Sequence, residues 1–330
     1  MGKGVYMFRS YGRFFPLLLA LLLLTGCGTM KAEEDSGYVD DVELAEVNLE
    51  DEAVALAESP AALDSLLQPV ASGTAVRKSS EALIDYSNIT DGYVMVKYTA
   101  STTQRLKAQV KGPTTTYTYN VTAGKWETFP LSDGNGAYQV TVYKNISGTK
   151  YSTVLSASFT AALKDEFAPF LRPNQYVDYT CAVNTVAKAQ ELTKDWTEPL
   201  EMVKVVYDYV VTNLTYDRQK AAAVQSGYLP VLDTVLAEKK GICFDYASLM
   251  TGMLRSQGVP CKLVVGYAGT AYHAWISVWS EETGWIDGAI YFDGTSWQRM
   301  DPTFASTGKQ SAKIMEYIGD GKNYTVKYIY

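Results

Sequence analysis

The stretch Gly241-Ile242-Cys243-Phe244-Asp245-Tyr246-Ala247 opens the segment that decides the fold of this 330-residue chain. From Cys243 to Arg255 the sequence is apolar on almost every side, which predicts a helix buried in a core. Gly258-Val259-Pro260 ends this helix. Short runs with strand character follow, over residues 262–267, 272–279, 285–292 and 296–300. Helices followed by an antiparallel sheet predict an α+β domain over residues 164–330.

Three side chains in this half of the chain have the chemistry of a nucleophilic triad. Cys243 lies in the first turn of the predicted helix, where free backbone N–H groups and the helix dipole favour a thiolate. His273, the only histidine, lies in a following strand, and Asp301 follows the last strand. In such a triad the base activates the nucleophile and the carboxylate orients the base. The sequence therefore predicts Cys243 as nucleophile, His273 as base and Asp301 as the orienting residue.

An acyl-transfer site also needs donors for the oxyanion of the tetrahedral intermediate. The backbone N–H of Cys243 is one predicted donor, and the hydroxyl of Tyr216 is the candidate for the second. Asp245, in the same first turn as Cys243, is expected to support the helix N-terminus and to take no part in the chemistry.

Four blocks in this half resemble the transglutaminase-like superfamily, in family order. They are residues 241–247, residues 258–267 with Val264-Val265-Gly266-Tyr267, His273-Ala274-Trp275 and Asp301-Pro302-Thr303. The resemblance covers about Thr197 to Phe304 and implies a papain-like cysteine-enzyme fold, with Cys243, His273 and Asp301 in the roles above. It leaves the reaction open, because similar proteins include cross-linking transglutaminases, peptidases, amidases and catalytically silent forms.

One departure from the family pattern concerns the third member of the triad. The interval between Trp275 and Asp301 is longer than the pattern has, and it contains Asp287 and Asp293 as alternatives to Asp301. Trp275 and Trp297 either fill the core or line a substrate groove, and the core is the favoured interpretation.

The first residues indicate where the protein acts. Lys3, Arg9 and Arg13 precede an apolar run over residues 14–24, which suits a signal peptide better than a membrane-spanning helix. The run closes with Leu24-Thr25-Gly26-Cys27, which resembles a bacterial lipobox. We therefore expect a signal peptide over residues 1–26, a lipid anchor on Cys27, and a location outside the cytoplasm at the cell membrane. The alternative is an ordinary signal peptide with a chance cysteine.

Residues 27–80 are rich in Glu, Asp, Ala and Ser, with almost no aromatic side chains. A segment of this composition buries too little apolar surface to offset the entropy of ordering. We expect an acidic flexible tether. A docking segment for a basic partner is the alternative.

Residues 81–163 are expected to form an immunoglobulin-like β-sandwich. Gly-rich turns separate the strand candidates, and two of these candidates show the period-two pattern of half-buried strands. Val94, Val96 and Tyr98 alternate with Met95 and Lys97, and Tyr138, Val140 and Val142 alternate with Gln139 and Thr141. The remaining candidates cover residues 106–110, 115–121, 126–131 and 151–159. This module either spaces the enzyme from the membrane or binds a wall polymer, because the fold alone does not assign a function.

The other cysteines and the acidic residues suggest no cofactor. Cys181 and Cys261 either fill apolar space or pair after export. One histidine makes a zinc site improbable, and no calcium loop is recognisable, so no metal or cofactor is expected.

The formal net charge of −7 argues against a nucleic-acid partner. The sequence thus predicts an extracytoplasmic, membrane-anchored cysteine enzyme that acts on envelope proteins or cell-wall peptides through a thioester intermediate. Water as the acceptor would make it a peptidase or amidase, which is slightly favoured, and an amine would make it a transglutaminase. The alternative is a catalytically silent lipoprotein that binds peptide or glycan.

Overall fold

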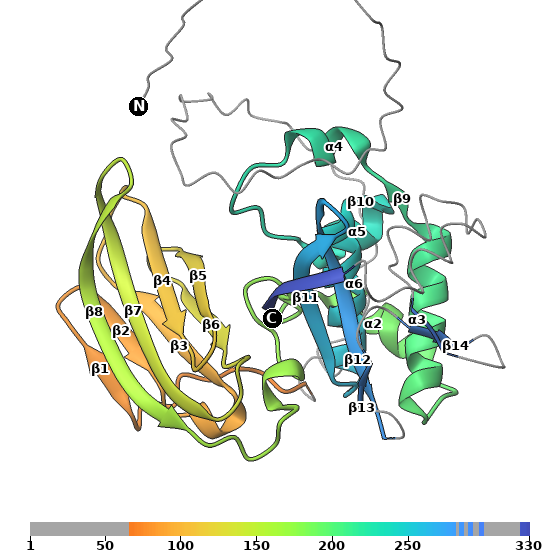
Figure 1. Ribbon diagram of the computed structural model, residues 1–330, viewed down its shortest axis with the longest axis horizontal. Helices are drawn as coiled ribbons and strands as arrows, with labels where there is room; N and C mark the ends of the chain where they lie inside the picture. Colours follow the sequence, from red (N-terminus) through yellow and green to blue (C-terminus); the bar gives the residue numbers. More distant parts are fainter. Residues whose placement is uncertain (1–65, 282–283, 287–289, 293–296, 300–323) are drawn as a thin grey trace, which may run out of the picture.

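The computed structural model describes residues 66–281, 284–286, 290–292, 297–299 and 324–330 (Figure 1). Cys27, Asp287, Asp293 and Asp301 lie outside these ranges, as does the tether up to residue 65. Among the described residues, no helix is long and apolar enough to cross a membrane.

The first region is a sandwich of two antiparallel sheets (Figure 1). One sheet has the order β1-β2-β3-β6 and the other has the order β5-β4-β7-β8. The strands are β1 (Val76–Lys78), β2 (Ala82–Asp85), β3 (Tyr93–Tyr98), β4 (Leu106–Lys111), β5 (Thr116–Val121), β6 (Trp126–Pro130), β7 (Gly136–Ser147) and β8 (Lys150–Ala161). The pairings β2–β3–β6 and β4–β7–β8 match the two sheets of the immunoglobulin fold. The region that was expected to consist of strands does so.

Strict alternation in β5 shows why these sequences form half-buried strands. Tyr117, Tyr119 and Val121 are buried, whereas Thr116 and Thr118 are exposed. In a strand, successive side chains point to opposite faces of the sheet. The inward side chains of both sheets form the core of the sandwich.

The second region packs helices on an antiparallel sheet, as predicted from the sequence. Its sheet has the order β13-β12-β11-β16. The strands are β11 (Cys261–Ala268), β12 (Ala271–Ser280), β13 (Gly284–Ile286) and β16 (Tyr324–Ile329). The helices are α2 (Val183–Thr193), α3 (Pro199–Asn213), α4 (Arg218–Ala223), α5 (Leu232–Glu238) and α6 (Cys243–Ser256). Helix α6 is buried along almost its whole length, between the sheet and helices α2, α3 and α5.

Two local expectations were wrong. The segment expected to be a loop, 213–228, contains helix α4, which begins because the Asp217 side chain accepts hydrogen bonds from the backbone N–H groups of Gln219 (3.0 Å) and Lys220 (2.9 Å). The single strand expected over 285–292 is two strands, because β13 pairs with β12 whereas β14 (Ile290–Phe292) pairs with β15 (Trp297–Arg299).

The two regions contact each other through the linker, which is residues 162–182 between β8 and α2, and through β16. The Gln175 side chain donates to the backbone oxygen of Asn120 at 2.8 Å, and Tyr176 packs against Tyr119 with ring centroids 5.8 Å apart. The ring centroid of Tyr328, on β16, lies 5.8 Å from that of Tyr117. The sandwich therefore rests against the helical region (Figure 1).

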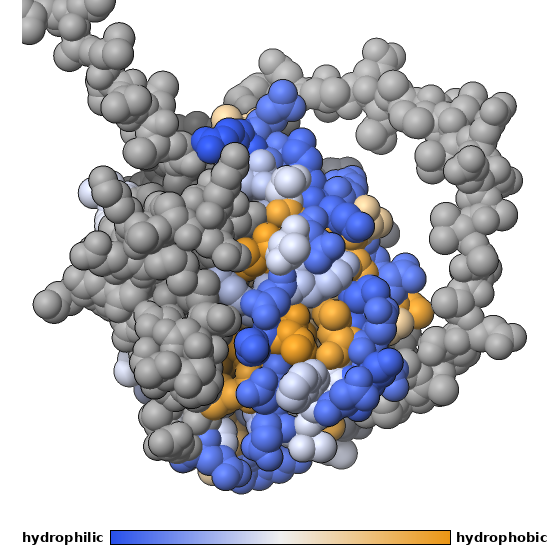
Figure 2. All heavy atoms as spheres, turned by 90° about the vertical axis from the view of Figure 1, so that its right-hand side faces the viewer, coloured by the Kyte–Doolittle hydropathy of each residue, from blue (hydrophilic) through white to orange (hydrophobic). Residues whose placement is uncertain are grey.

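Cys181 and Cys261 differ in their exposure to solvent. Cys181 is exposed and Cys261 is buried, and both are free thiols, so they do not pair, and only Cys261 fills apolar space as expected. Burial raises the pKa of the Cys261 thiol to about 11. Figure 2, which views the molecule from the α3 side, shows hydrophobic areas separated by hydrophilic side chains.

Candidate active site

The predicted nucleophile begins helix α6. Ile242 is extended and occupies the N-cap position, and Cys243 is the first helical residue. The Asp245 carboxylate accepts a hydrogen bond from the backbone N–H of Ile242 at 2.8 Å, which fixes the entry of the chain into the helix. A Cβ atom at Gly241 would lie 2.6 Å from the Cβ atom of Asp245, so only glycine fits there.

The predicted base lies on strand β12, beside the start of α6. His273 is 1% exposed and pairs in register with Gly266 of β11. The sheet bearing β12 packs against α6. Pairing of β11 with β12 therefore sets the position of the imidazole, and α6 sets the position of the thiol.

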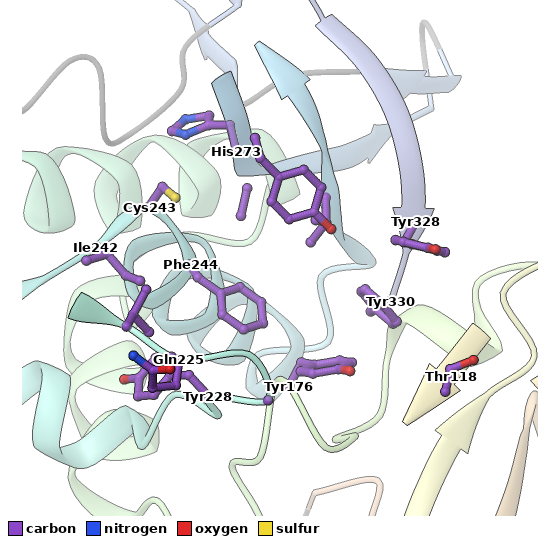
Figure 3. A pocket seen from close by; sticks show the side chains of 15 residues that line it. Thr118, Tyr176, Gln225, Tyr228, Ile242, Cys243, Phe244, His273, Tyr328 and Tyr330 are labelled. Atoms are coloured by element: carbon purple, nitrogen blue, oxygen red, sulfur yellow. The ribbon is translucent and has the colours of Figure 1, made fainter. Parts of the chain in front are cut away.

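Cys243 and His273 line the same cavity, which has a volume of about 260 Å³. Figure 3 shows them at one end of this space, with Thr118 and Tyr328 at the other. Cys243 is half-buried, so the thiol borders the cavity. The remaining lining residues are Thr118, Tyr176, Val224, Gln225, Gly227, Tyr228, Ile242, Phe244, Val265, Tyr272, Ala274, Tyr328 and Tyr330. The structure thus brings together two of the three predicted catalytic residues.

A cluster of polar side chains surrounds the buried Asp245 in the first turn of α6. The Asp245 side chain has no exposed surface, and its carboxylate lies 2.8 Å from the Lys220 ammonium. The Tyr228 hydroxyl donates to Asp245 at 2.6 Å, and Lys220 donates to the Tyr228 oxygen at 2.6 Å. Burial, with the adjacent Asp245, raises the pKa of Tyr228 well above its ordinary value. Asp245 supports the helix start, as expected, and it also holds the segment that bears Tyr228.

Several predicted site residues stand elsewhere. Asp301 and its alternatives Asp287 and Asp293 lie outside the described residues. Tyr216 forms the short strand β9 (Thr215–Tyr216), which pairs in parallel with β10 (Lys240–Gly241) and places Tyr216 opposite Gly241. The backbone of Tyr216 therefore lies close to the start of the nucleophile helix, but Tyr216 is not among the residues that line the cavity. Trp275 is 1% exposed and belongs to the interior.

Sequence reasoning missed Lys220, Tyr228 and Thr118. Lys220 and Tyr228 lie in a segment without apolar periodicity, and Thr118 is a surface residue of a region that showed no catalytic character. Only the N-cap residue Asp217, with the run of alanines after it, could have indicated that the segment bearing Lys220 is ordered. Within the described ranges, no group of three or more His, Cys, Asp or Glu side chains could hold a metal ion.

Comparison with known proteins places this site in a family. Residues 186–302 match the family model described as the transglutaminase-like superfamily. The chain is 28% identical over 117 residues to the uncharacterised protein YebA of Bacillus subtilis, covering 30% of this chain and 16% of YebA. It is 31% identical over 68 residues to a protein-glutamine gamma-glutamyltransferase of Pseudomonas aeruginosa, covering 16% of this chain and 10% of that protein.

A solved structure shows a more distant likeness. The periplasmic domain of TgpA from Pseudomonas aeruginosa is 18% identical with a TM-score of 0.33, covering 74% of this chain and 78% of that one. The chain spans at most about half the length of the curated relatives it matches. The matched range contains α6, Cys243, β12 and His273. Residues 186–302 of this chain therefore match a transglutaminase-like domain.

Proposed function

We propose that this chain is a cysteine acyl-transfer enzyme that acts on peptide or carboxamide bonds. The observation that carries the proposal is that Cys243, at the N-terminus of α6, and His273, on β12, line one cavity. A thiol and an imidazole at a shared cavity, inside a transglutaminase-like domain, are the parts that thioester chemistry needs.

The reaction proceeds in two balanced steps. His273 takes the proton of the Cys243 thiol, and the sulfur attacks the carbonyl carbon to give a tetrahedral oxyanion. The carbon–nitrogen bond breaks, the amine leaves with the proton from His273, and a thioester remains. His273 then takes a proton from the acceptor, whose oxygen or nitrogen attacks the thioester and releases the thiol.

Water is the proposed acceptor, which makes the chain a peptidase or amidase. Transamidation is the second candidate, because one relative is named as a protein-glutamine gamma-glutamyltransferase. Asp301 is proposed to orient His273, and the Tyr216 hydroxyl is proposed to donate a hydrogen bond to the oxyanion. Both roles are inferred from the positions of these residues in the sequence. Asp301→Asn is expected to lower kcat more than it changes KM.

The proposal places the enzyme outside the cytoplasm, tethered through a lipid on Cys27, with envelope proteins or cell-wall peptides as substrates. Its support is the apolar run that ends at Leu24-Thr25-Gly26-Cys27. Mass spectrometry of the chain purified from membranes tests the anchor. An N-terminal cysteine with added acyl mass is expected, and Cys27→Ser should release the protein from membranes. A chain that starts upstream of Cys27 without acyl mass would contradict it.

The activity is tested with the full chain in detergent, incubated with a library of glutamine-bearing peptides with and without a primary amine. Products are read by mass spectrometry beside Cys243→Ala, and Cys181→Ala is the matched control because Cys181 is exposed and is not among the residues that line the cavity. Hydrolysis or deamidation that ignores the amine identifies a hydrolase. Amine incorporation identifies a transglutaminase.

Thiol labelling separates an enzyme from a silent binding protein. In the Cys181→Ala background, a thiol-reactive probe should label Cys243 at mildly acidic pH, and His273→Ala should abolish the labelling because the thiolate depends on its imidazole partner. No product from any peptide, together with an unreactive Cys243, would overturn the proposal in favour of a peptide-binding or glycan-binding lipoprotein.

A further inference from the structure

The cavity beside Cys243 extends beyond the thiol and the imidazole and has walls from both regions of the molecule. Thr118 comes from β5 of the sandwich, residues 224–228 from the segment after α4, and Tyr328 and Tyr330 from β16 and its end. Figure 3 shows these walls facing one space. We propose that this space is a specificity subsite for an uncharged aromatic side chain of a peptide substrate, within one residue of the carbonyl that Cys243 attacks. The inference rests on the proposed acyl-transfer function.

The lining favours a neutral occupant. Apart from those of Cys243 and His273, the described side chains that line the cavity carry no formal charge. Burial raises the pKa of Tyr176 and of Tyr272 to about 12, so both hydroxyls stay protonated at neutral pH. A charged side chain would lose its hydration there without gaining an ionic partner, which is costly.

The floor of the cavity favours an aromatic ring. Tyr176 packs against Tyr330 with ring centroids 4.5 Å apart and against Phe244 at 5.6 Å. Tyr330 in turn lies 5.6 Å from Tyr117 and 6.1 Å from Tyr328. Such spacings are those of tilted and edge-to-face pairs, which add to the area that aromatic side chains bury. One more ring would extend this cluster.

The volume fits one side chain. Pockets for whole drug-sized ligands hold roughly 300–1,000 Å³, and this one holds about 260 Å³. A single aromatic side chain, with the peptide backbone passing Cys243 and His273, matches that size better than a polymer segment does.

The wall at residues 224–228 is held from two sides. The Tyr228 hydroxyl is bound to the buried Asp245, at the start of the nucleophile helix. Gly227 has a φ of +88°, and a Cβ atom there would lie 2.4 Å from the Asn120 side-chain nitrogen of the sandwich. The sandwich thus forms a wall of the subsite and also limits where the opposite wall can lie.

The test introduces charge at one exposed position of β5 and uses a neighbour on the same face of the strand as control. Thr118 lines the cavity, whereas Thr116, two residues earlier and equally on the exposed face, does not. The full chain in detergent is assayed with peptides that carry Phe, Lys or Glu next to the scissile carbonyl. We expect the wild type to favour Phe over Lys and Glu by at least about tenfold in kcat/KM.

Thr118→Glu should raise the Lys-to-Phe ratio of kcat/KM, and Thr118→Lys the Glu-to-Phe ratio, each by up to about fivefold, the effect of one partly exposed ion pair. Thr116→Glu and Thr116→Lys should leave both ratios within about twofold. If the wild type converts all three peptides equally, or if the two positions behave alike, the subsite is wrong and the enzyme proposal stands.

A second measurement covers the case in which no peptide is converted. Labelled Phe, Lys and Glu peptides are then titrated against Cys243→Ala and followed by fluorescence anisotropy. Tighter binding of the Phe peptide, with a preference that Thr118→Glu shifts toward Lys, supports the subsite although the enzyme proposal has failed. Equal binding of the three peptides, or none, overturns the subsite as well.

Discussion

The two ends of helix α6 each hold a buried charge, but they use it differently. At the first turn, Asp245 is bound by the side chains of Lys220 and Tyr228, and the adjacent Cys243 borders a cavity. At the last turn, Arg255 is 2% exposed and donates to the main-chain oxygens of Cys261 (2.8 Å), Arg172 (2.8 Å) and Tyr330 (2.7 Å).

The difference separates function from stability along one helix. Two partners of Arg255, Arg172 and Tyr330, lie far from it in the sequence, and Cys261 begins the strand that follows the helix, so this end ties the linker, β11 and the end of β16 to the helix. The side-chain partners of Asp245, Lys220 and Tyr228, come from one segment, part of which lines the cavity. We therefore expect the larger loss of activity from changes at the first turn and the larger loss of stability from changes at the last turn.

The largest effect is expected from the thiol. Cys243→Ala should lower kcat/KM by at least about 10⁴-fold, because a nucleophile cannot be replaced by its neighbours. The melting temperature should change by no more than about 2 °C, since the side chain is small and half-buried. Activity assays beside calorimetry check this, and a Cys243→Ala protein that keeps its activity would remove the functional half of the comparison.

The second largest effect is expected from Arg255→Met. Three charge-assisted hydrogen bonds are lost and three main-chain oxygens are left buried, so we expect the free energy of unfolding to fall by about 3–5 kcal/mol. Arg218→Met is the matched control, because Arg218 is exposed and its replacement should cost less than about 0.5 kcal/mol. Urea unfolding of both variants gives the values. Similar losses at the two positions would mean that the last turn of α6 has no special structural role.

Asp245→Asn tests the first turn and should cost about 1–3 kcal/mol, because the buried ion pair with Lys220 is lost while the side chain keeps its shape. The exposed pair of Lys240 and Asp217, 3.1 Å apart, is the control, and Lys240→Met should cost less than about 1 kcal/mol. A double-mutant cycle of Asp245→Asn with Lys220→Met isolates the coupling. A coupling near zero would show that the two groups do not hold the cavity wall together.

Alkaline pH should lower the free energy of unfolding through tyrosines near both ends of α6, and this is the smallest of the expected effects. Burial raises the pKa of Tyr176, at the cavity, to about 12, and it raises the pKa of Tyr179, near Arg255, as well. Unfolded tyrosine has a pKa of about 10, so the unfolded state releases protons first and stability falls as pH rises from about 10 toward 12. The slope is at most about 1.4 kcal/mol per pH unit for each tyrosine. Urea midpoints from pH 8 to 11 measure it, and Tyr176→Phe should reduce it.

Much of this arrangement could be predicted from the sequence, because it depends on local patterns. The apolar run after Cys243 makes α6 a core helix, and alternation in strands such as β4 and β5 marks their buried faces. Since Cys243 opens that helix and His273 lies two strands along, the predicted meeting of thiol and imidazole at one cavity agrees with the structure.

The rest depends on contacts between residues far apart in the sequence. Nothing local indicates that Thr118 borders the cavity, because that follows from how the sandwich docks. In the sequence, Arg255 is an ordinary basic residue at a helix end, and only the fold brings the main-chain oxygens of Arg172 and Tyr330 to it. Lys220 and Asp245 are 25 positions apart, and only the fold brings them together. The role of Asp301 stays a prediction, as it lies outside the described residues.

Gln175, which binds the backbone oxygen of Asn120, has a consequence for solubility. Strand β5 is at the edge of its sheet, where unpaired backbone groups invite another strand to add. In the whole chain, Gln175, Tyr176 and Tyr330 cover part of this edge and the rings of Tyr117 and Tyr119. A sandwich produced alone would expose them and should self-associate, so in the whole chain these three residues protect the sandwich from aggregation.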